Sequence, residues 1–257
     1  MGAVPGPVTA WIVVPCFNEE ARLDDTAFLS LVEPGDLRLL FVNDGSRDGT
    51  ETRLRALRDR RPERIDFLSL PRNLGKAEAV RSGMREALDR GAEIVGYTDA
   101  DLSTPVAELR RLWSILGAAP RVQVLLASRV SLLGADIQRR AARHYLGRVF
   151  ASLASLMLQL RVYDTQCGAK LFRRTPALEA ALDEPFTSRW AFDVELLGRL
   201  AIGTATAPAI PVEAFLEVPL RTWVDVAGSK LRFTSMARTL VDLARVGSDL
   251  AKRRAAR

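Results

Sequence analysis

The sequence contains only two cysteines, Cys16 and Cys167, and they lie far apart in the chain. No disulfide framework is therefore indicated, and a reducing compartment is the default expectation. No uninterrupted apolar run approaches the roughly 20 residues that a transmembrane helix needs. The first residues, Met-Gly-Ala-Val-Pro-Gly-Pro, lack the basic and apolar regions of a signal peptide. We therefore expect a cytoplasmic protein unless some other feature attaches it to a membrane.

Internal repeats and low-complexity linkers are also missing, and the 257 residues can bury a large core within one domain. The hydrophobic share of 48% and the charged share of 26% are those of an ordinary globular protein. The formal net charge of +6 favours acidic partners, which include phosphates, nucleic acid and anionic lipid surfaces. Nucleic acid is disfavoured, because the aromatic residues are not interleaved with basic ones as a stacking platform requires.

Short apolar segments alternate with segments of helical periodicity along the first half of the chain. We predict strands over 11–14, 37–42, 67–70, 93–98 and 123–128, with Pro15 ending the first. Helical patterns cover 50–60 and 77–88, and Thr104 followed by Pro105 reads as an N-cap and first helical position. Strands separated by helices indicate βαβ units, so we expect an α/β fold with a mostly parallel central sheet.

Two aspartates, Asp99 and Asp101, follow the fourth predicted strand. Residues i and i+2 of an extended chain point to the same side, so both carboxylates leave the strand end together. Two hard oxygen ligands at one point suit Mg2+ or Mn2+, with substrate phosphates completing the coordination shell. In open α/β sheets, ligands bind at the carboxyl ends of the strands. A plain solvated turn is the alternative interpretation, because aspartate and serine are ordinary turn residues.

The first three predicted strands also end in polar or glycine-bearing clusters. Asp44 could accept hydrogen bonds from a nucleobase edge, and Lys76 offers a point charge to a phosphate. Gly45 and Gly75 permit close approach of the backbone to a ligand. Each cluster alone could be a plain turn between a strand and a helix. Four such clusters on successive strands favour a ligand site at one edge of the sheet.

A series of short motifs runs in order along the chain from about residue 11 to 232. They lie at 14–20, 42–50, 72–76, 98–105, 127–129, 164–172, 190–195 and 228–230. This series resembles the family 2 glycosyltransferases, which have the GT-A fold. The later motifs resemble the branch of dolichyl-phosphate glucosyltransferases and mannosyltransferases, which glycosylate a polyprenyl phosphate. One departure is Asn43, where many members carry a second aspartate.

The resemblance implies inverting transfer of a sugar from a nucleoside diphosphate, with a divalent cation stabilising the charge on the leaving phosphate. The nucleotide-sugar residues that it implies are Pro15, Phe17, Glu19, Asp44, Lys76 and Asp99. Pro15, Phe17 and Glu19 would line the nucleoside pocket. Asp44 would contact the base, and Lys76 would approach the ribose or the diphosphate. Asp99 would face the nucleotide, and Asp101 would hold the metal.

Two segments of the second half are amphipathic and basic. In 139–160 one predicted helical face carries Leu146, Val149, Phe150, Leu153, Leu156, Met157 and Leu160. In 233–257 an apolar stripe precedes a basic end, and we predict a C-terminal helix or tail there. The chain would then consist of an N-terminal tail over 1–10, a transferase domain over 11–232 and this last segment. Either segment could pack on the core or lie in a membrane interface. Together they favour peripheral attachment to the inner face of an anionic membrane.

Several basic residues are candidates for binding an acceptor phosphate, because arginine binds phosphate with a two-pronged geometry. They are Arg129, one of Arg139, Arg140 and Arg143, and Lys230, with plain surface charge as the alternative. Asp193 occupies a position where family 2 enzymes often place an acidic residue near the acceptor. Its alternative role is a helix N-terminal acid stabilised by the macrodipole.

The leading interpretation is an inverting transferase that moves a hexose, glucose first and mannose next, from UDP-glucose or GDP-mannose to a polyprenyl phosphate. A second interpretation keeps the fold but uses a hydroxyl acceptor, for which Asp193 would be a general base. A third is a non-catalytic protein that binds nucleotide sugars. The Asp99 and Asp101 pair argues against the third, because a binding module needs no metal at a leaving diphosphate.

Overall fold

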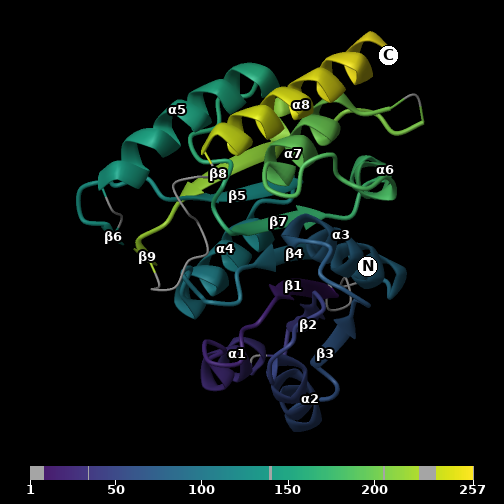
Figure 1. Cartoon of the computed structure of the whole chain (residues 1–257), viewed down its shortest axis with the longest axis vertical. Helices are drawn as coiled ribbons and strands as arrows, with labels where there is room; N and C mark the ends of the chain where they lie inside the picture. Colours follow the sequence, from purple (N-terminus) through teal and green to yellow (C-terminus); the bar gives the residue numbers. More distant parts are fainter. Residues whose placement is uncertain (1–8, 34, 139–140, 205, 226–235, 257) are drawn as a thin grey trace, which may run out of the picture.

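The computed structural model describes residues 9–33, 35–138, 141–204, 206–225 and 236–256, apart from the side chains of 138, 141–149 and 236–240. Its central sheet has seven strands in the order β3-β2-β1-β4-β7-β5-β8 (Figure 1). The strands are β1 (Ala10–Cys16), β2 (Leu37–Asn43), β3 (Ile65–Ser69), β4 (Ile94–Thr98), β5 (Val124–Ser128), β7 (Ala169–Arg173) and β8 (Phe215–Pro219). Only β7 runs antiparallel to its neighbours in this sheet, so the predicted mostly parallel arrangement is confirmed.

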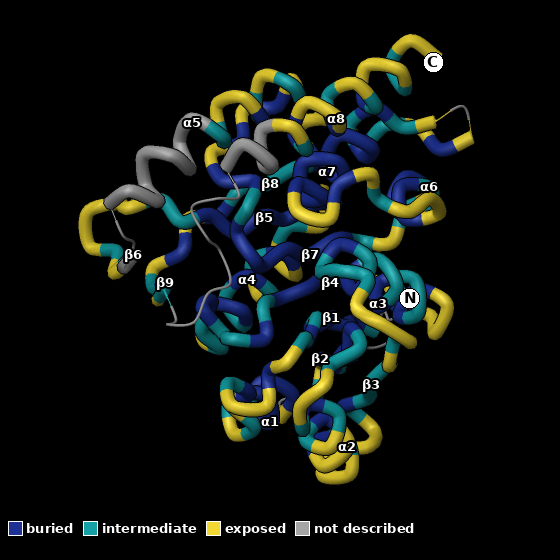
Figure 2. Tube along the Cα trace, in the orientation of Figure 1, coloured by how far each residue is buried: buried dark blue, intermediate teal, exposed yellow. Residues whose placement is uncertain are grey.

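Helices cover both faces of this sheet. One face packs against α1 (Asp25–Val32), α2 (Thr50–Arg60) and α4 (Val106–Ala118). The other packs against α3 (Lys76–Asp89), α5 (Ala141–Leu158), α6 (Pro176–Asp183), α7 (Phe192–Ile202) and α8 (Met236–Ala255). The alternation along β1 shows the division, because Ile12 faces the first set and Val13 faces the second. Figure 2 shows that the central strands are mostly buried, whereas the described helices also carry exposed residues on their outer sides.

A smaller sheet pairs β6 (Asp136–Gln138) with β9 (Thr222–Val224), and a short 3-10 helix, η1 (Val212–Ala214), precedes β8. None of these three elements was predicted, and no strand was predicted at β7 or β8 either. None of the helices in the described part of the chain combines the length and apolar character that crossing a bilayer requires.

Several predicted boundaries were wrong by one or two residues, and three of these differences have a structural explanation. Pro15 lies inside β1, because the pairing of β1 with β4 ends at Val13 and the missing N–H breaks no hydrogen bond on that side. The helix after the acid pair begins at Val106, with extended Pro105 rather than Thr104 as its N-cap residue. The third strand is Ile65–Ser69 rather than 67–70, since its register with β2 starts at Ile65.

The predicted apolar face of 139–160 is only partly buried. Phe150, Met157 and Leu160 pack on the core, whereas Leu153 and Leu156 are exposed at 39% and 77%. Ala154 and Leu158, which were not assigned to that face, are buried. The contact of α5 with α7 selects which side of the helix is buried, and periodicity alone could not identify that neighbour. Leu146 and Val149 lie outside the described side chains.

The last helix, α8, is part of the domain core. Leu243, Val246 and Leu250 are buried and α8 contacts α7, whereas Ala244 of the predicted stripe is exposed. The described leucines of α8 therefore pack against the protein itself. Two of its terminal arginines also have internal partners. Arg253 pairs with Asp249 and Glu184, and Arg254 donates to the carbonyl oxygen of Met157. The described part of the predicted tail is therefore a packed helix.

Candidate active site

The carboxyl ends of β1, β2 and β4 lie at one edge of the sheet because these strands are parallel neighbours. Strand β7 runs the other way, so its first residue, Ala169, pairs with Thr98, the last residue of β4. This reversal brings Cys167 and Gly168 to the same edge as Asp99. The edge therefore combines segments from both halves of the sequence, as a binding site in an open α/β sheet does.

Reciprocal hydrogen bonds join the loop after β1 to the loop after β2. The Asn18 side chain accepts from the Arg47 N–H at 2.9 Å, and the Ser46 hydroxyl accepts from the Asn18 N–H at 3.0 Å. The Thr50 hydroxyl accepts from the Glu19 N–H at 2.8 Å. Glu19 itself is buried beside Arg22, with 2.5 Å between Oε1 and Nη2. These hydrogen bonds fix the loop after β1 next to Pro15 and Phe17, which are partly buried.

Asp44, at the end of β2, holds the loop that follows β3. Its carboxylate oxygens accept from the backbone N–H groups of Leu74 at 2.7 Å and Gly75 at 2.8 Å. Burial raises the pKa of Asp44, and the two N–H groups offset this only in part. The neighbouring Asn43 side chain accepts from the Ser46 N–H at 3.0 Å and donates to Glu51 at 3.1 Å. Asn43 thus organises the turn from which Asp44 projects.

Lys76 begins α3 and reaches across to the acid pair. Its Nζ lies 2.5 Å from Oδ1 of Asp99, and both side chains are 35% exposed. Desolvation opposes the ammonium charge, but Asp99, Asp193 and Asp101 outweigh it and raise the pKa of Lys76. A cation and a pair of carboxylates therefore share this edge. Such a set can bind an anionic phosphate and a divalent cation together.

Asp99 and Asp101 are oriented by their surroundings. Oδ1 of Asp101 accepts from the N–H of Ser103 at 3.0 Å and from its hydroxyl at 2.8 Å. Asp99 packs against Gly168, where an added Cβ would overlap the carboxylate. In the described part of the chain, no group of three or more His, Cys, Asp or Glu side chains could hold a metal ion. Two carboxylates suit an ion that takes its other ligands from phosphates and water.

Behind Asp99 lies a buried cluster of Tyr97, Lys170 and Asp193. Nζ of Lys170 lies 2.6 Å from Oδ1 of Asp193 and donates to the Cys167 carbonyl oxygen at 2.7 Å. The Tyr97 hydroxyl donates to the same Asp193 oxygen. The Lys170 and Asp193 side chains are 0% and 6% exposed. Burial first, and then the Asp193 charge, raise the pKa of Tyr97.

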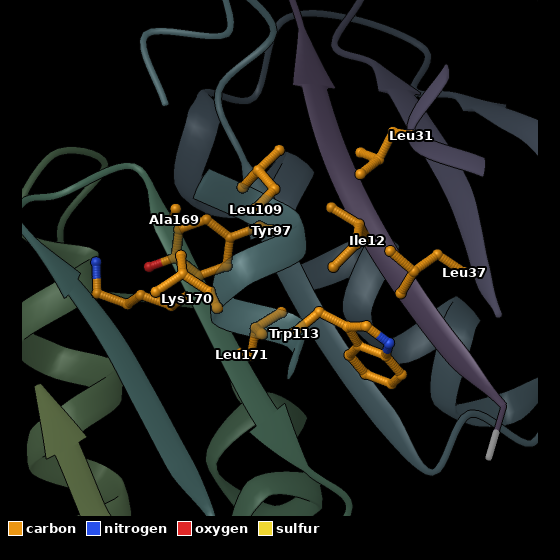
Figure 3. A pocket seen from close by; sticks show the side chains of 10 residues that line it. Ile12, Leu31, Leu37, Tyr97, Leu109, Trp113, Ala169, Lys170 and Leu171 are labelled. Carbon is orange, nitrogen blue, oxygen red and sulfur yellow. The ribbon is translucent and has the colours of Figure 1, made fainter. Parts of the chain in front are cut away.

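Figure 3 shows the Tyr97 hydroxyl and the Lys170 ammonium pointing to the same side, away from an apolar cavity. The cavity is lined by Ile12, Leu31, Leu37, Tyr97, Leu109, Leu112, Trp113, Ala169, Lys170 and Leu171. Most of these side chains belong to the core between the sheet and helices α1 and α4. The cavity is therefore a gap in the hydrophobic core, separate from the polar strand ends.

Arg129, at the end of β5, is held by Asp164. Its Nε and Nη2 lie 2.7 and 2.8 Å from the two Asp164 oxygens, and its guanidinium lies over the Trp223 ring at 5.3 Å. Desolvation opposes the charge, but Asp164 outweighs it and raises the pKa of Arg129. Glu217 fixes this arrangement further by accepting from the Asp164 N–H at 2.8 Å. The guanidinium is thus presented in one orientation.

The structure brings several predicted residues together at one edge: Lys76, Asp99, Asp101 and, through the 73–75 loop, Asp44. Asp193 lies close by but inside the protein. Arg139, Arg140 and Lys230 lie outside the described residues, as does the side chain of Arg143. Sequence reasoning assigned no role to Tyr97, Gly168, Lys170 or Arg189. Gly168 and Lys170 lie within a motif that was identified, but only the reversal of β7 shows what they contact.

A family model described as glycosyl transferase family 2 matches residues 11–179 of the chain. The chain is 35% identical over 239 residues to a dolichyl-phosphate beta-glucosyltransferase of Drosophila melanogaster, covering 86% of this chain and 68% of that protein. It is 30% identical over 240 residues to the human protein of that name, with 86% and 68% coverage. A Trichomonas vaginalis protein of that name is 29% identical over 255 residues, with 94% and 72% coverage.

Solved structures with a similar fold include glucosyl-3-phosphoglycerate synthase from Mycobacterium tuberculosis, in complex with Mn2+, UDP and glucosyl-3-phosphoglycerate. It matches with a TM-score of 0.61 and 18% identity, over 97% of this chain and 81% of that one. A mannosyltransferase from Pyrobaculum calidifontis, in complex with GDP-mannose and Mn2+, matches with a TM-score of 0.51 and 20% identity. That match covers 85% of this chain and 58% of the other. At these identities the likeness concerns the fold.

Proposed function

The chain belongs to glycosyl transferase family 2, and from this we propose that it transfers a hexose from a nucleoside-diphosphate sugar to a polyprenyl phosphate of the dolichyl type. The transfer inverts the anomeric carbon in one in-line step. Glucose from UDP-glucose is the favoured donor sugar, because the relatives are named dolichyl-phosphate beta-glucosyltransferases. Mannose from GDP-mannose is the next candidate.

The donor binds at the edge of the sheet where Lys76 meets the acid pair. Pro15, Phe17 and Glu19 line the nucleoside side, with Asp44 toward the base. Asp99 and Asp101 would hold Mg2+ or Mn2+, which when bound would supply positive charge to stabilise the leaving diphosphate. Lys76 approaches the ribose or the diphosphate as a second positive charge.

The observation that carries the choice of acceptor is the environment of Asp193. A general base must be free to take a proton from the attacking group, yet Asp193 is buried and pairs with the Lys170 ammonium. A hydroxyl acceptor needs such a base. A phosphate monoester, whose second pKa is about 6, is already mostly a dianion at neutral pH and needs none. The paired Asp193 therefore supports the phosphate acceptor. Arg129, Arg139, Arg143 and Lys230 are its proposed ligands.

The acceptor is a lipid, so the protein must reach a membrane surface, and we place it at the cytoplasmic face as a peripheral protein. Leu132 and Leu133, between β5 and β6, are exposed at 53% and 108%, and Leu153 and Leu156 of α5 are also exposed. Exposed leucines of this kind suit insertion into the boundary between headgroups and acyl chains. The L132D/L133D variant should bind anionic vesicles more weakly than wild type. Val212→Asp, at a residue 58% exposed before β8, is the control.

A donor and acceptor screen tests the proposal directly. UDP-glucose, GDP-mannose, UDP-GlcNAc and UDP-galactose are each incubated with Mn2+ and either a short polyprenyl phosphate or the matching polyprenol, and products are read by mass. We expect a glycosylated phosphate from UDP-glucose and no product from the polyprenol. Transfer to the polyprenol with none to the phosphate would replace the proposed acceptor with a hydroxyl.

A further inference from the structure

We infer that Arg189 is a positioning residue for the donor, because it fixes the 73–75 loop from which Lys76 projects toward Asp99. The inference rests on the proposed function, since it concerns the same nucleotide-sugar site. Arg189 lies in the segment between α6 and α7, far in sequence from the loop that it contacts. It therefore joins the second half of the chain to a strand end of the first half.

The loop is held from two sides by side chains of opposite charge. Asp44 accepts from the N–H groups of Leu74 and Gly75. Arg189 donates from Nε to the Leu74 carbonyl oxygen at 2.9 Å, and from Nη2 to the Asn73 carbonyl and side-chain oxygens at 3.3 and 3.1 Å. Backbone donors and acceptors of the loop are thus both satisfied by charged groups, which make stronger hydrogen bonds than neutral ones.

Gly75 makes room for this contact. Its φ of 99° lies where side chains are rarely tolerated, and an added Cβ would lie 2.6 Å from Nε of Arg189. The guanidinium therefore packs on the bare backbone of the residue that precedes Lys76. A loop held in this way leaves Lys76 little freedom to leave the position opposite Asp99, which is the preorganisation that charge stabilisation requires.

Arg189 is exposed, but the segment that carries it is rigidly held. The hydroxyl of Ser188 accepts from the N–H groups of Trp190 at 3.1 Å and Ala191 at 2.8 Å. Glu195, which is fully buried and paired with Arg199 at 2.6 Å, accepts from the N–H groups of Thr187 and Ser188. The backbone at Arg189 is therefore fixed before the side chain makes its bonds. Less entropy is then lost in forming the contact.

The test compares Arg189→Met and Arg189→Lys with wild type by two measurements. Hydrogen exchange should accelerate at the N–H groups of 73–76 in Arg189→Met, and the affinity for UDP in the presence of Mn2+, measured by calorimetry, should fall about ten-fold, or about 1.4 kcal/mol. Arg189→Lys keeps the charge but lacks the two-pronged geometry, so its affinity should stay at least about three-fold below wild type.

The control is Arg174→Met. Arg174 is also an exposed arginine, with one ion pair to Glu179 at 2.6 Å and one bond to the Leu88 carbonyl oxygen at 3.0 Å, so its loss should affect stability without affecting UDP affinity. Unchanged hydrogen exchange at 73–76, or unchanged UDP affinity, in Arg189→Met would overturn the inference about Arg189 and leave the proposed function standing. Wild-type protein that binds neither UDP nor GDP would overturn the proposed function, and the inference with it.

Discussion

Replacing Gly168 by alanine should disable the site while leaving the fold in place. A Cβ at this position would lie 2.5 Å from Cγ of Asp99 and overlap one of its oxygens. Carbon atoms in contact prefer about 3.5–4.0 Å, so either the carboxylate or the β7 turn must move by about 1 Å. The φ of Gly168 is not positive, so the added methyl group acts by steric overlap rather than by backbone strain.

Overpacking of this size costs about 1–3 kcal/mol of folding free energy, which a domain of this length tolerates. Displacement of a catalytic group by about 1 Å can cost about 10²-fold in rate. We therefore expect the kcat/KM of Gly168→Ala to fall about 10²-fold with UDP-glucose and polyprenyl phosphate, together with weaker Mn2+ affinity in the presence of UDP. The unfolding midpoint in urea should fall only modestly.

The matched control is Gly117→Ala in α4. A Cβ there meets nothing within 4 Å, and glycine inside a helix is less stable than alanine by about 0.5–1 kcal/mol. This variant should be slightly stabilised and fully active. If Gly168→Ala kept wild-type kcat/KM and Mn2+ affinity, the carboxylate of Asp99 would not be needed where the structure places it.

Three other predictions concern the Asp101 carboxylate, the buried pair of Lys170 and Asp193, and the Cys167 thiol. Asp101→Asn should lose about 10²-fold or more in turnover, and wild type should lose as much in excess EDTA. Full activity in EDTA would show that the reaction needs no metal ion. Lys170→Met leaves Asp193 charged and buried without its partner, so urea unfolding should show a loss of about 3–5 kcal/mol; a loss below about 1 kcal/mol would contradict the pairing. Burial raises the pKa of Cys167 to about 11, so about 10⁻³ of it is thiolate at about pH 8, and thiol reagents should label it only after unfolding.

Periodicity predicted strands β1 to β5 and the edge with Asp99 and Asp101, because buried strands and strand-end polar residues are local features. The reversal of β7 is not local. Its sequence, Ala-Lys-Leu-Phe-Arg, places a lysine where solvent exposure would be the ordinary expectation. Lys170 is buried only because Tyr97 and Asp193 converge on it from distant segments, and no spacing rule relates the three. The same limit applies to α5, where contact with α7 decides that Ala154 rather than Leu153 is buried.

The pairing of Asp193 with Lys170 also bears on which acceptor the site can admit. An unpaired carboxylate beside the reaction centre would help to deprotonate a hydroxyl but would repel a dianionic phosphate, and at low dielectric like charges repel by several kcal/mol. In this protein the Lys170 ammonium lies 2.6 Å from that carboxylate and compensates its charge. Asp99 and Asp101 carry two negative charges against the single positive charge of Lys76, so net negative charge remains where a divalent cation would bind. Under the proposed function, the buried lysine would make one site compatible with both a metal-bound diphosphate and an incoming phosphate nucleophile.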